Sequence, residues 1–228
     1  VTDDAEGEVV QTRLANAVTP ERVAEQVAAL TGEILQAPSA VSAVKVAGRR
    51  AYDRVRAGED VTLDARPVTV HEFTVHELRR LDGGRLVDLD VTVRCSSGTY
   101  IRALARDLGE ALETGGHLTA LRRTAVGPFD VADALSLEAL AERFAMTELS
   151  EAAAGLFPVR ELTEHEAHEL AFGRVVAPTG TGETLVAGRA PDGRVIALVS
   201  DVRRRGADVA KPQLVFAPAE GPGQGRTA

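Results

Sequence analysis

The sequence feature that most constrains the fold is a change of periodicity at residues 95–102, Cys-Ser-Ser-Gly-Thr-Tyr-Ile-Arg. Apolar residues occupy every second position from Val87 to Cys95, which is the period of a β-strand with one buried face. Beyond Tyr100 they recur at helical spacing. A tight strand-to-helix turn presents backbone N–H groups to an anion, and Arg102 adds a permanent positive charge. The stretch alone therefore predicts a site for an anionic group, with Tyr100 available to stack or hydrogen-bond.

Composition limits the classes of protein that remain. The chain of 228 residues is long enough for one large domain, or for a medium domain with a small one. Its one cysteine excludes an internal disulfide, and it has neither a long apolar run nor a secretory signal, so we expect a cytoplasmic protein without a membrane partner.

The charge of the chain is unevenly placed. The formal net charge of −8 argues against a nucleic-acid partner, and residues 138–169 are rich in Glu. Residues 45–56, in contrast, are basic, and a local basic face can attract a polyanion to an acidic chain. The cations of this segment are Lys45, Arg49, Arg50, Arg54 and Arg56.

Local signals predict an α+β fold, with a mixed or antiparallel sheet and flanking helices. In the N-terminal part we expect a helix over 19–31, with Thr19 as its cap and Pro20 in its first turn, and further helices over 49–57 and 99–114. We expect a loop over 33–48 that includes a short strand over 42–46, and strands over 66–75, 85–95 and 117–124. A hairpin turn is expected at Asp82-Gly83-Gly84. In the C-terminal part we expect a short acidic helix that starts at Ser136, a helix over 148–154, and a helix over 163–172 that Thr163 caps. We expect strands over 184–188, 195–200 and 213–216.

Pro158 is the expected domain boundary. We predict a first domain over 1–157, with an insertion at about 33–60, and a small β-rich domain over 158–217. The Gly/Pro-rich residues 218–228 are expected to be a disordered tail.

Few residues offer catalytic chemistry by themselves. His165 and His168 share a helix face, but acidic neighbours favour a solvated surface there over a metal site. Ser97 lacks the G-x-S-x-G pattern of hydrolases, and Cys95 falls on the buried face of its strand. Arg102 is harder to dismiss, because a partly buried arginine requires a carboxylate partner. It is either a structural ion pair or a clamp in a catalytic site.

Several ordered motifs together resemble the tRNA pseudouridine-55 synthase family of the TruB type. They span roughly residues 2–143, and their number and order make a chance match improbable. The motifs are Gln36-Ala37-Pro38-Ser39, Ser42-Ala43-Val44-Lys45-Val46, Gly48-Arg49-Arg50-Ala51-Tyr52, Arg56-Ala57-Gly58, Ala65-Arg66-Pro67-Val68, the stretch over 95–102, Asp107-Leu108-Gly109, Gly116-His117-Leu118 and Leu121-Arg122-Arg123-Thr124.

The resemblance implies an enzyme that isomerises uridine 55 in the T loop of tRNA to pseudouridine. The uracil is detached from its ribose, turned, and rejoined through C5, after the base has been extruded from the loop. The family uses no cofactor and no metal. The resemblance also implies a pseudouridine synthase-like catalytic domain and a PUA-like C-terminal domain, and we expect a monomer.

Site residues follow from the resemblance position by position. Arg102 matches the arginine that orients the catalytic aspartate, Tyr100 lines the uracil pocket, and Leu121 forms an apolar pocket wall. The RNA-gripping insertion places Lys45, Arg49, Arg50 and Arg56 as phosphate contacts. Val41 replaces an aromatic residue that is frequent in the family, which removes stacking at that position.

The catalytic aspartate itself is not found in this sequence. The family carries it in a G-x-L-D-P-x-A-T-G motif, which is absent here. The chain begins with Val1 rather than Met, and its first residues resemble the family segment just downstream of that motif, so we expect a fragment that is inactive alone. We accordingly expect Arg102 to lack its carboxylate partner. The alternatives are a non-enzymatic RNA-binding module and a small-molecule enzyme that uses Arg102 to clamp an anion.

Overall fold

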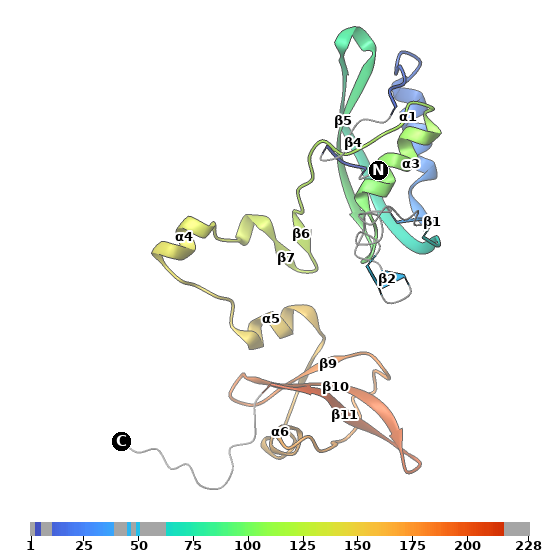
Figure 1. Ribbon diagram of the computed structural model, residues 1–228. Helices are drawn as coiled ribbons and strands as arrows, with labels where there is room; N and C mark the ends of the chain where they lie inside the picture. The colour runs from blue at the N-terminus through green and yellow to red at the C-terminus, as the bar shows by residue number, and fades with distance from the viewer. Residues whose placement is uncertain (1–2, 6–10, 39–44, 47–48, 51–62, 217–228) are drawn as a thin grey trace. The chain divides into compact units, whose positions relative to one another are not determined.

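A long antiparallel hairpin forms the centre of the N-terminal unit in this computed structural model (Figure 1). It pairs β4 (Arg66–Leu81) with β5 (Leu86–Cys95), and the Asp82–Gly84 turn between them was expected from the sequence. The structure describes residues 3–5, 11–38, 45–46, 49–50 and 63–216. The chain divides into two units, Val1–Arg122 and Arg123–Ala228, and each is described by itself.

Two helices cover one face of the N-terminal sheet. Thr19 caps α1 (Pro20–Ala29) by accepting a hydrogen bond from the Arg22 N–H, and Pro20 occupies the first turn, as the sequence predicts. Helix α3 (Ile101–Ala111) follows the 95–102 stretch. The core between helices and sheet is apolar and is built from Val23, Val27, Leu108 and Leu112 with Phe73, Val75, Leu78, Val87 and Leu89.

The loop expected over 33–48 is wrong in its first part. Residues Gly32–Gln36 form β1, which pairs antiparallel with β4 and completes the order β1-β4-β5. This strand has only five residues, and the residues that it pairs with lie 30 to 38 positions away, so no local signal identified it.

The helix expected to begin at Arg49 is also wrong at its start. A two-residue strand β2 (Lys45–Val46) pairs with β3 (Arg49–Arg50), so the basic segment begins as a hairpin. The rest of the expected helix lies outside the described residues.

A third correction concerns residues 117–124, which were expected to form a strand. The segment has no regular strand, and its Leu118 makes an isolated parallel bridge to Asp4. Leu121 in this segment is 64% exposed, which does not fit the buried face of a strand.

The second unit begins with short elements. A hairpin of β6 (Ala125–Val126) and β7 (Phe129–Asp130) turns at Gly127 and is followed by the turn η2 (Val131–Asp133). Helices α4 (Leu137–Glu142) and α5 (Leu149–Leu156) then lie where the sequence predicts helices.

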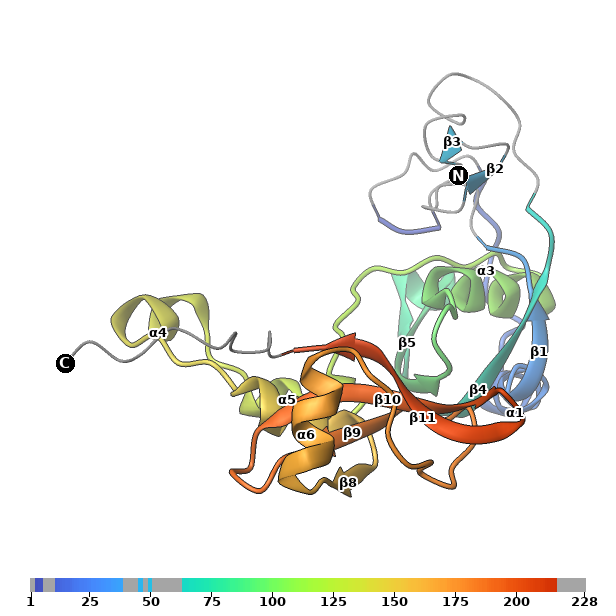
Figure 2. The ribbon, with the colours of Figure 1, turned by 90° about the horizontal axis from the view of Figure 1, so that it is seen from below.

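A four-stranded sheet with one helix on its face completes the second unit. The order is β11-β10-β9-β8, and only β8 runs parallel to its neighbour among the described strands of this sheet. Figure 2 shows α6 lying over these strands, and its Leu170 is fully buried against Val199 and Ala210. The elements are β8 (Val159–Glu161), α6 (Glu164–Ala171), β9 (Val186–Arg189), β10 (Val195–Arg204) and β11 (Ala207–Val215).

The expected α+β class, with antiparallel and mixed sheets, is confirmed. The domain boundary expected near Pro158 falls inside the second unit and stays a prediction. The described helices include none that is both long and apolar enough to cross a membrane. Residues 217–228, where we expect the tail, lie outside the described part of the chain.

Candidate functional site

Small polar residues shape the turn between β5 and α3. The Ser96 N–H donates to the Thr69 carbonyl at 2.8 Å, and the Thr69 N–H donates to Ser96 Oγ at 2.9 Å. Thr99 Oγ1 donates back to the Ser96 carbonyl at 3.0 Å, and Gly98 supplies the positive φ of 85° that the turn requires. The turn is thereby attached to β4, and it sets the direction in which α3 begins.

A buried glutamine holds the first residue of this helix start. Gln36, at the end of β1, is 2% exposed. Its side-chain oxygen accepts from the Tyr100 N–H at 2.8 Å, and its side-chain NH₂ donates to the Tyr100 carbonyl at 3.2 Å. Tyr100 has no side-chain cap of its own, so Gln36 satisfies the backbone at the helix N-terminus. Apart from the Gln-Ala-Pro-Ser motif itself, no sequence signal marks this contact.

Arg102 is paired, and the expectation that it lacks a carboxylate is wrong. Its Nη1 lies 2.9 Å from Asp4 Oδ2, and the two side chains are 26% and 22% exposed. The Leu118 N–H donates to the Asp3 carbonyl at 3.1 Å, so backbone pairing brings the acidic N-terminal segment to α3. The requirement of a partly buried arginine for a carboxylate is therefore met inside the chain.

A second arginine, not identified from the sequence, lies one helical turn further along α3. Arg106 contacts Asp3 at 3.6 Å and Asp107 at 2.7 Å, and it donates to the Ala37 carbonyl at 2.8 Å. The i, i+4 spacing of Arg102 and Arg106 was the available signal. Together they give this face of α3 two cations held by acidic residues.

A glycine contact brings the 115–118 segment onto α3. A Cβ at Gly109 would overlap the carbonyl carbon of Gly115, and a Cβ at Gly116 would overlap the Ala105 carbonyl oxygen. Because Leu118 in this segment pairs with Asp3, the close approach also positions Asp4 beside Arg102.

The remaining expected site residues are Tyr100, Leu121 and four cations of the basic segment. Tyr100 is half-buried at the start of α3, whereas Leu121 is 64% exposed and does not form an enclosed wall with the described residues. Lys45, Arg49 and Arg50 share the β2–β3 hairpin, in the register Lys45 to Arg50. Arg56 lies outside the described residues.

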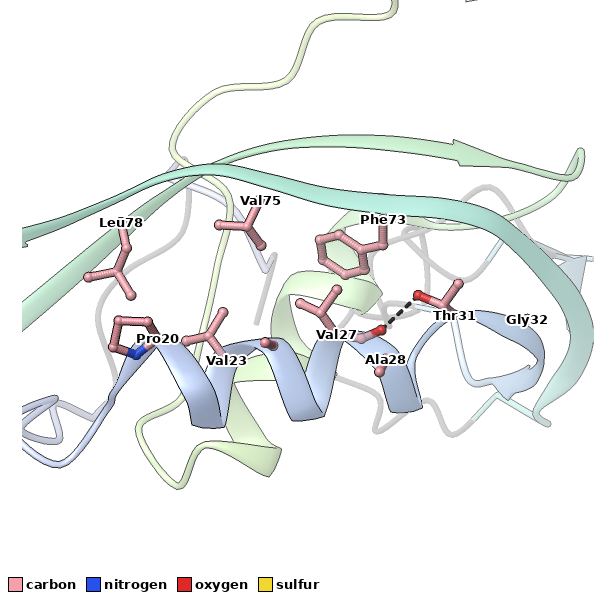
Figure 3. Close-up of a pocket in the computed structure, with 10 residues that line it drawn as sticks. Pro20, Val23, Val27, Ala28, Thr31, Gly32, Phe73, Val75 and Leu78 are labelled. Carbon is pink, nitrogen blue, oxygen red and sulfur yellow. Dashed lines mark hydrogen bonds between the residues drawn. The ribbon is translucent and has the colours of Figure 1, made fainter.

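An apolar groove of about 710 Å³ lies between α1 and β4 and contains none of the expected site residues (Figure 3). Val23, Val27 and Phe73 line it, and Thr31 Oγ1 donates to the Val27 carbonyl at 2.7 Å at one end.

Metal-binding side chains do not gather in the described part of the chain. The structure shows no group there of three or more His, Cys, Asp or Glu side chains able to hold an ion. His168 instead packs its ring 4.8 Å from that of Phe172. Glu166, on the same helix, forms a capping box with Thr163, and the hydrogen bond from the Thr163 N–H holds the pKa of Glu166 below its ordinary range.

We predict that Asp4 and Arg102 stabilise the fold as a coupled pair. A double-mutant cycle with Asp4→Asn and Arg102→Gln should give a coupling free energy of about 1 kcal/mol, since the pair is partly desolvated. Urea unfolding followed by tyrosine fluorescence isolates the first unit, because both tyrosines of the chain, Tyr52 and Tyr100, belong to it.

The matched control is the exposed pair of Arg79 and Asp88, at 2.7 Å, whose side chains are 43% and 32% exposed. Its cycle should give at most about 0.5 kcal/mol. Equal coupling in the two cycles would contradict a special role for Asp4.

Three family models together match residues 1–217, and the second and third of them overlap. The TruB family pseudouridylate synthase N-terminal domain matches residues 1–101. The tRNA pseudouridylate synthase B C-terminal domain matches residues 102–178, and the tRNA pseudouridine synthase II C-terminal model matches residues 157–217.

Curated relatives match over nearly the whole chain. The tRNA pseudouridine synthase B of Arthrobacter sp. (strain FB24) is 58% identical over 233 residues, which cover 98% of this chain and 75% of that protein. The protein of the same name from Thermobifida fusca (strain YX) is 53% identical over 218 residues, covering 95% and 73% respectively.

Solved structures agree in fold. The chain matches the crystal structure of a Cbf5-Nop10-Gar1 complex with a TM-score of 0.65 at 21% identity, covering 92% of this chain and 65% of that one. A structure of an H/ACA RNP bound to a substrate RNA containing 2'-deoxyuridine matches with a TM-score of 0.67 at 20% identity. This chain thus spans about two thirds of each structure's matching chain, and at such identities the likeness concerns the fold alone.

Proposed function

We propose that this chain, which belongs to the TruB family of pseudouridylate synthases, supplies part of a site that isomerises uridine 55 of tRNA. Its part consists of the arginine that orients the catalytic carboxylate and the surface that binds the RNA. The partner is then the T-stem loop of tRNA. The observation that carries the proposal is the pair of Arg102 and Asp4 at the start of α3.

The arginine has a positioning role in this proposal. A guanidinium has five N–H donors in a planar fork, which is enough to hold more than one carboxylate. Asp4 accepts from Nη1 and restrains the guanidinium, while Gln36 fixes the backbone two residues earlier. A restrained cation favours the ionised form of a carboxylate brought beside it, as a nucleophilic aspartate requires.

The reaction needs no oxidant, reductant or metal. The bond between uracil N1 and ribose C1′ breaks, a bond between C5 and C1′ forms, the C5 proton leaves, and N1 gains a proton. Tyr100 is proposed to line the uracil pocket and Leu121 to form part of its wall. Lys45, Arg49, Arg50 and Arg56 are proposed to contact phosphates, which adds affinity rather than chemistry.

The loss of the C5 proton gives a direct assay for this proposal. The sequence has no G-x-L-D-P-x-A-T-G motif, so the chain alone should bind an unmodified tRNA transcript without releasing tritium from [5-³H]uridine. Fused to the segment of a family member that carries the motif, it should release tritium. Replacing Arg102 by Lys in that fusion should slow release by about 10- to 100-fold, because the planar fork is lost.

Arg79→Lys is the control, because Arg79 contacts Asp88 at a similar distance outside the proposed site. Equal rates for Arg102→Lys and the unaltered fusion would overturn the role of Arg102. RNA binding with no release from the fusion would favour the alternative, a non-enzymatic RNA-binding module.

We propose in addition that the protein is a cytoplasmic monomer.

A further inference from the structure

The β10–β11 hairpin ends in three consecutive exposed arginines, Arg203, Arg204 and Arg205. Strand β10 ends at Arg204, β11 begins at Ala207, and the two strands run side by side (Figure 1). We call Arg203–Arg205 the arginine tip. Neither the motifs that resemble the family nor the proposed site includes it.

The arginine tip differs in its ion pairs from the other arginines of residues 159–216. Residues 159–216 are all described, and four arginines in that segment pair with carboxylates. These pairs are Arg160 with Glu166, Arg174 with Glu169, Arg189 with Glu161, and Arg194 with Asp192.

In the same described segment, no arginine of the tip forms an ion pair. Asp208 faces Arg203 across the ladder without pairing to it, and Arg203 donates to the Gly206 carbonyl at 3.4 Å instead. Asp201 accepts from the backbone N–H groups of Thr179 and Gly180. Asp201 and Asp208 thus lie near the tip, but neither forms an ion pair with its arginines.

The turn makes this arrangement costly to the fold. Arg205 has a φ of 51° and Gly206 a φ of 87°. Two-residue turns with positive φ at both positions favour Asn-Gly or Asp-Gly, and an arginine at the first position is strained. Three adjacent like charges repel one another as well. An anion bound from outside the chain would offset both the backbone strain and the charge repulsion, which explains why the sequence keeps them.

We propose that the arginine tip binds phosphate groups of the tRNA backbone, as a second RNA contact in addition to the basic hairpin of β2 and β3. This inference rests on the proposed function. Guanidinium groups match phosphate oxygens bidentately, and such contacts add affinity without reading sequence. The Glu-rich helices of the same unit repel a polyanion, so the tip concentrates attraction at one end of the sheet.

The test measures affinity of the chain for an unmodified tRNA transcript at several salt concentrations. A variant with Arg203→Gln, Arg204→Gln and Arg205→Asn should bind about tenfold more weakly at low salt. The slope of log K against log salt should fall by about one for each phosphate that the variant no longer neutralises. Arg205→Asn alone should raise the melting temperature, because asparagine suits its turn position. Weaker tRNA binding by this single variant cannot then reflect unfolding.

The control variant removes the same number of charges from paired arginines, with Arg174→Gln, Arg189→Gln and Arg194→Gln. It should leave the salt slope closer to that of the unaltered chain. An unchanged slope in the tip variant, or equal losses in tip and control variants, would overturn the tip proposal and leave the proposed function standing. An unaltered chain that does not bind tRNA would overturn both.

Discussion

Replacing Gly109 by alanine is expected to destabilise the N-terminal unit by about 3 kcal/mol. In most helices the same exchange is stabilising by up to about 1 kcal/mol, because alanine is the better helix former. Here a Cβ would overlap the carbonyl carbon of Gly115 and the amide nitrogen of Gly116. Both atoms belong to the backbone, so no side-chain rotation relieves the overlap.

The effect should extend to the site as well as to stability. Moving residues 115–118 away from α3 weakens the pairing of Leu118 with Asp3, and with it the placement of Asp4 beside Arg102. The measurement is the urea midpoint from tyrosine fluorescence, together with the coupling free energy of the Asp4 and Arg102 pair in the Gly109→Ala background. We expect that coupling to fall to nearly zero.

Gly155→Ala in α5 is the control with the opposite sign. A Cβ there would lie 3.8 Å from Pro128 Cγ, an ordinary contact, so this variant should be neutral or slightly stabilising by circular dichroism. Destabilisation by both exchanges to the same extent would contradict a specific contact at Gly109.

Elements with a clear capping or turn signal were predicted correctly from the sequence. The Thr19 cap with Pro20, the turn at Asp82–Gly84 and the capped helix after Thr163 depend on residues within a few positions of one another. Such signals act through backbone hydrogen bonds that the neighbouring residues alone decide.

The contacts of Tyr100 and Arg102 that were missed depend on residues far apart in the chain. Gln36 and Tyr100 are 64 positions apart, and Asp4 and Arg102 are 98 apart. A sequence pattern shows that Arg102 needs a carboxylate, but not which one, because the choice depends on the path of residues 115–118. The resemblance to a family named Arg102 without finding Asp4, and it did not mark Gln36 as a contact of Tyr100.

Replacing Gln36 by glutamate is expected to destabilise the N-terminal unit by about 3 to 5 kcal/mol at pH 7. The introduced carboxylate can accept from the Tyr100 N–H but cannot donate to the Tyr100 carbonyl, and at a site that is 2% exposed its charge is desolvated. Gln36→Leu should cost less, about 2 kcal/mol, because it leaves the Tyr100 N–H unpaired without burying a charge.

The pH dependence separates the two variants. Burial raises the pKa of the introduced carboxyl in the folded state above its unfolded value of about 4.3. Relative to the unaltered chain, the glutamate variant should therefore be least destabilised below about pH 4.3, where its protonated carboxyl can donate to the Tyr100 carbonyl. The deficit should grow as the pH rises through the folded-state pKa, while the deficit of Gln36→Leu should not change with pH. Urea midpoints between about pH 4 and 7 measure both, and a pH-independent deficit for Gln36→Glu would show that the side chain at position 36 is not held in a buried hydrogen-bonded pair with Tyr100.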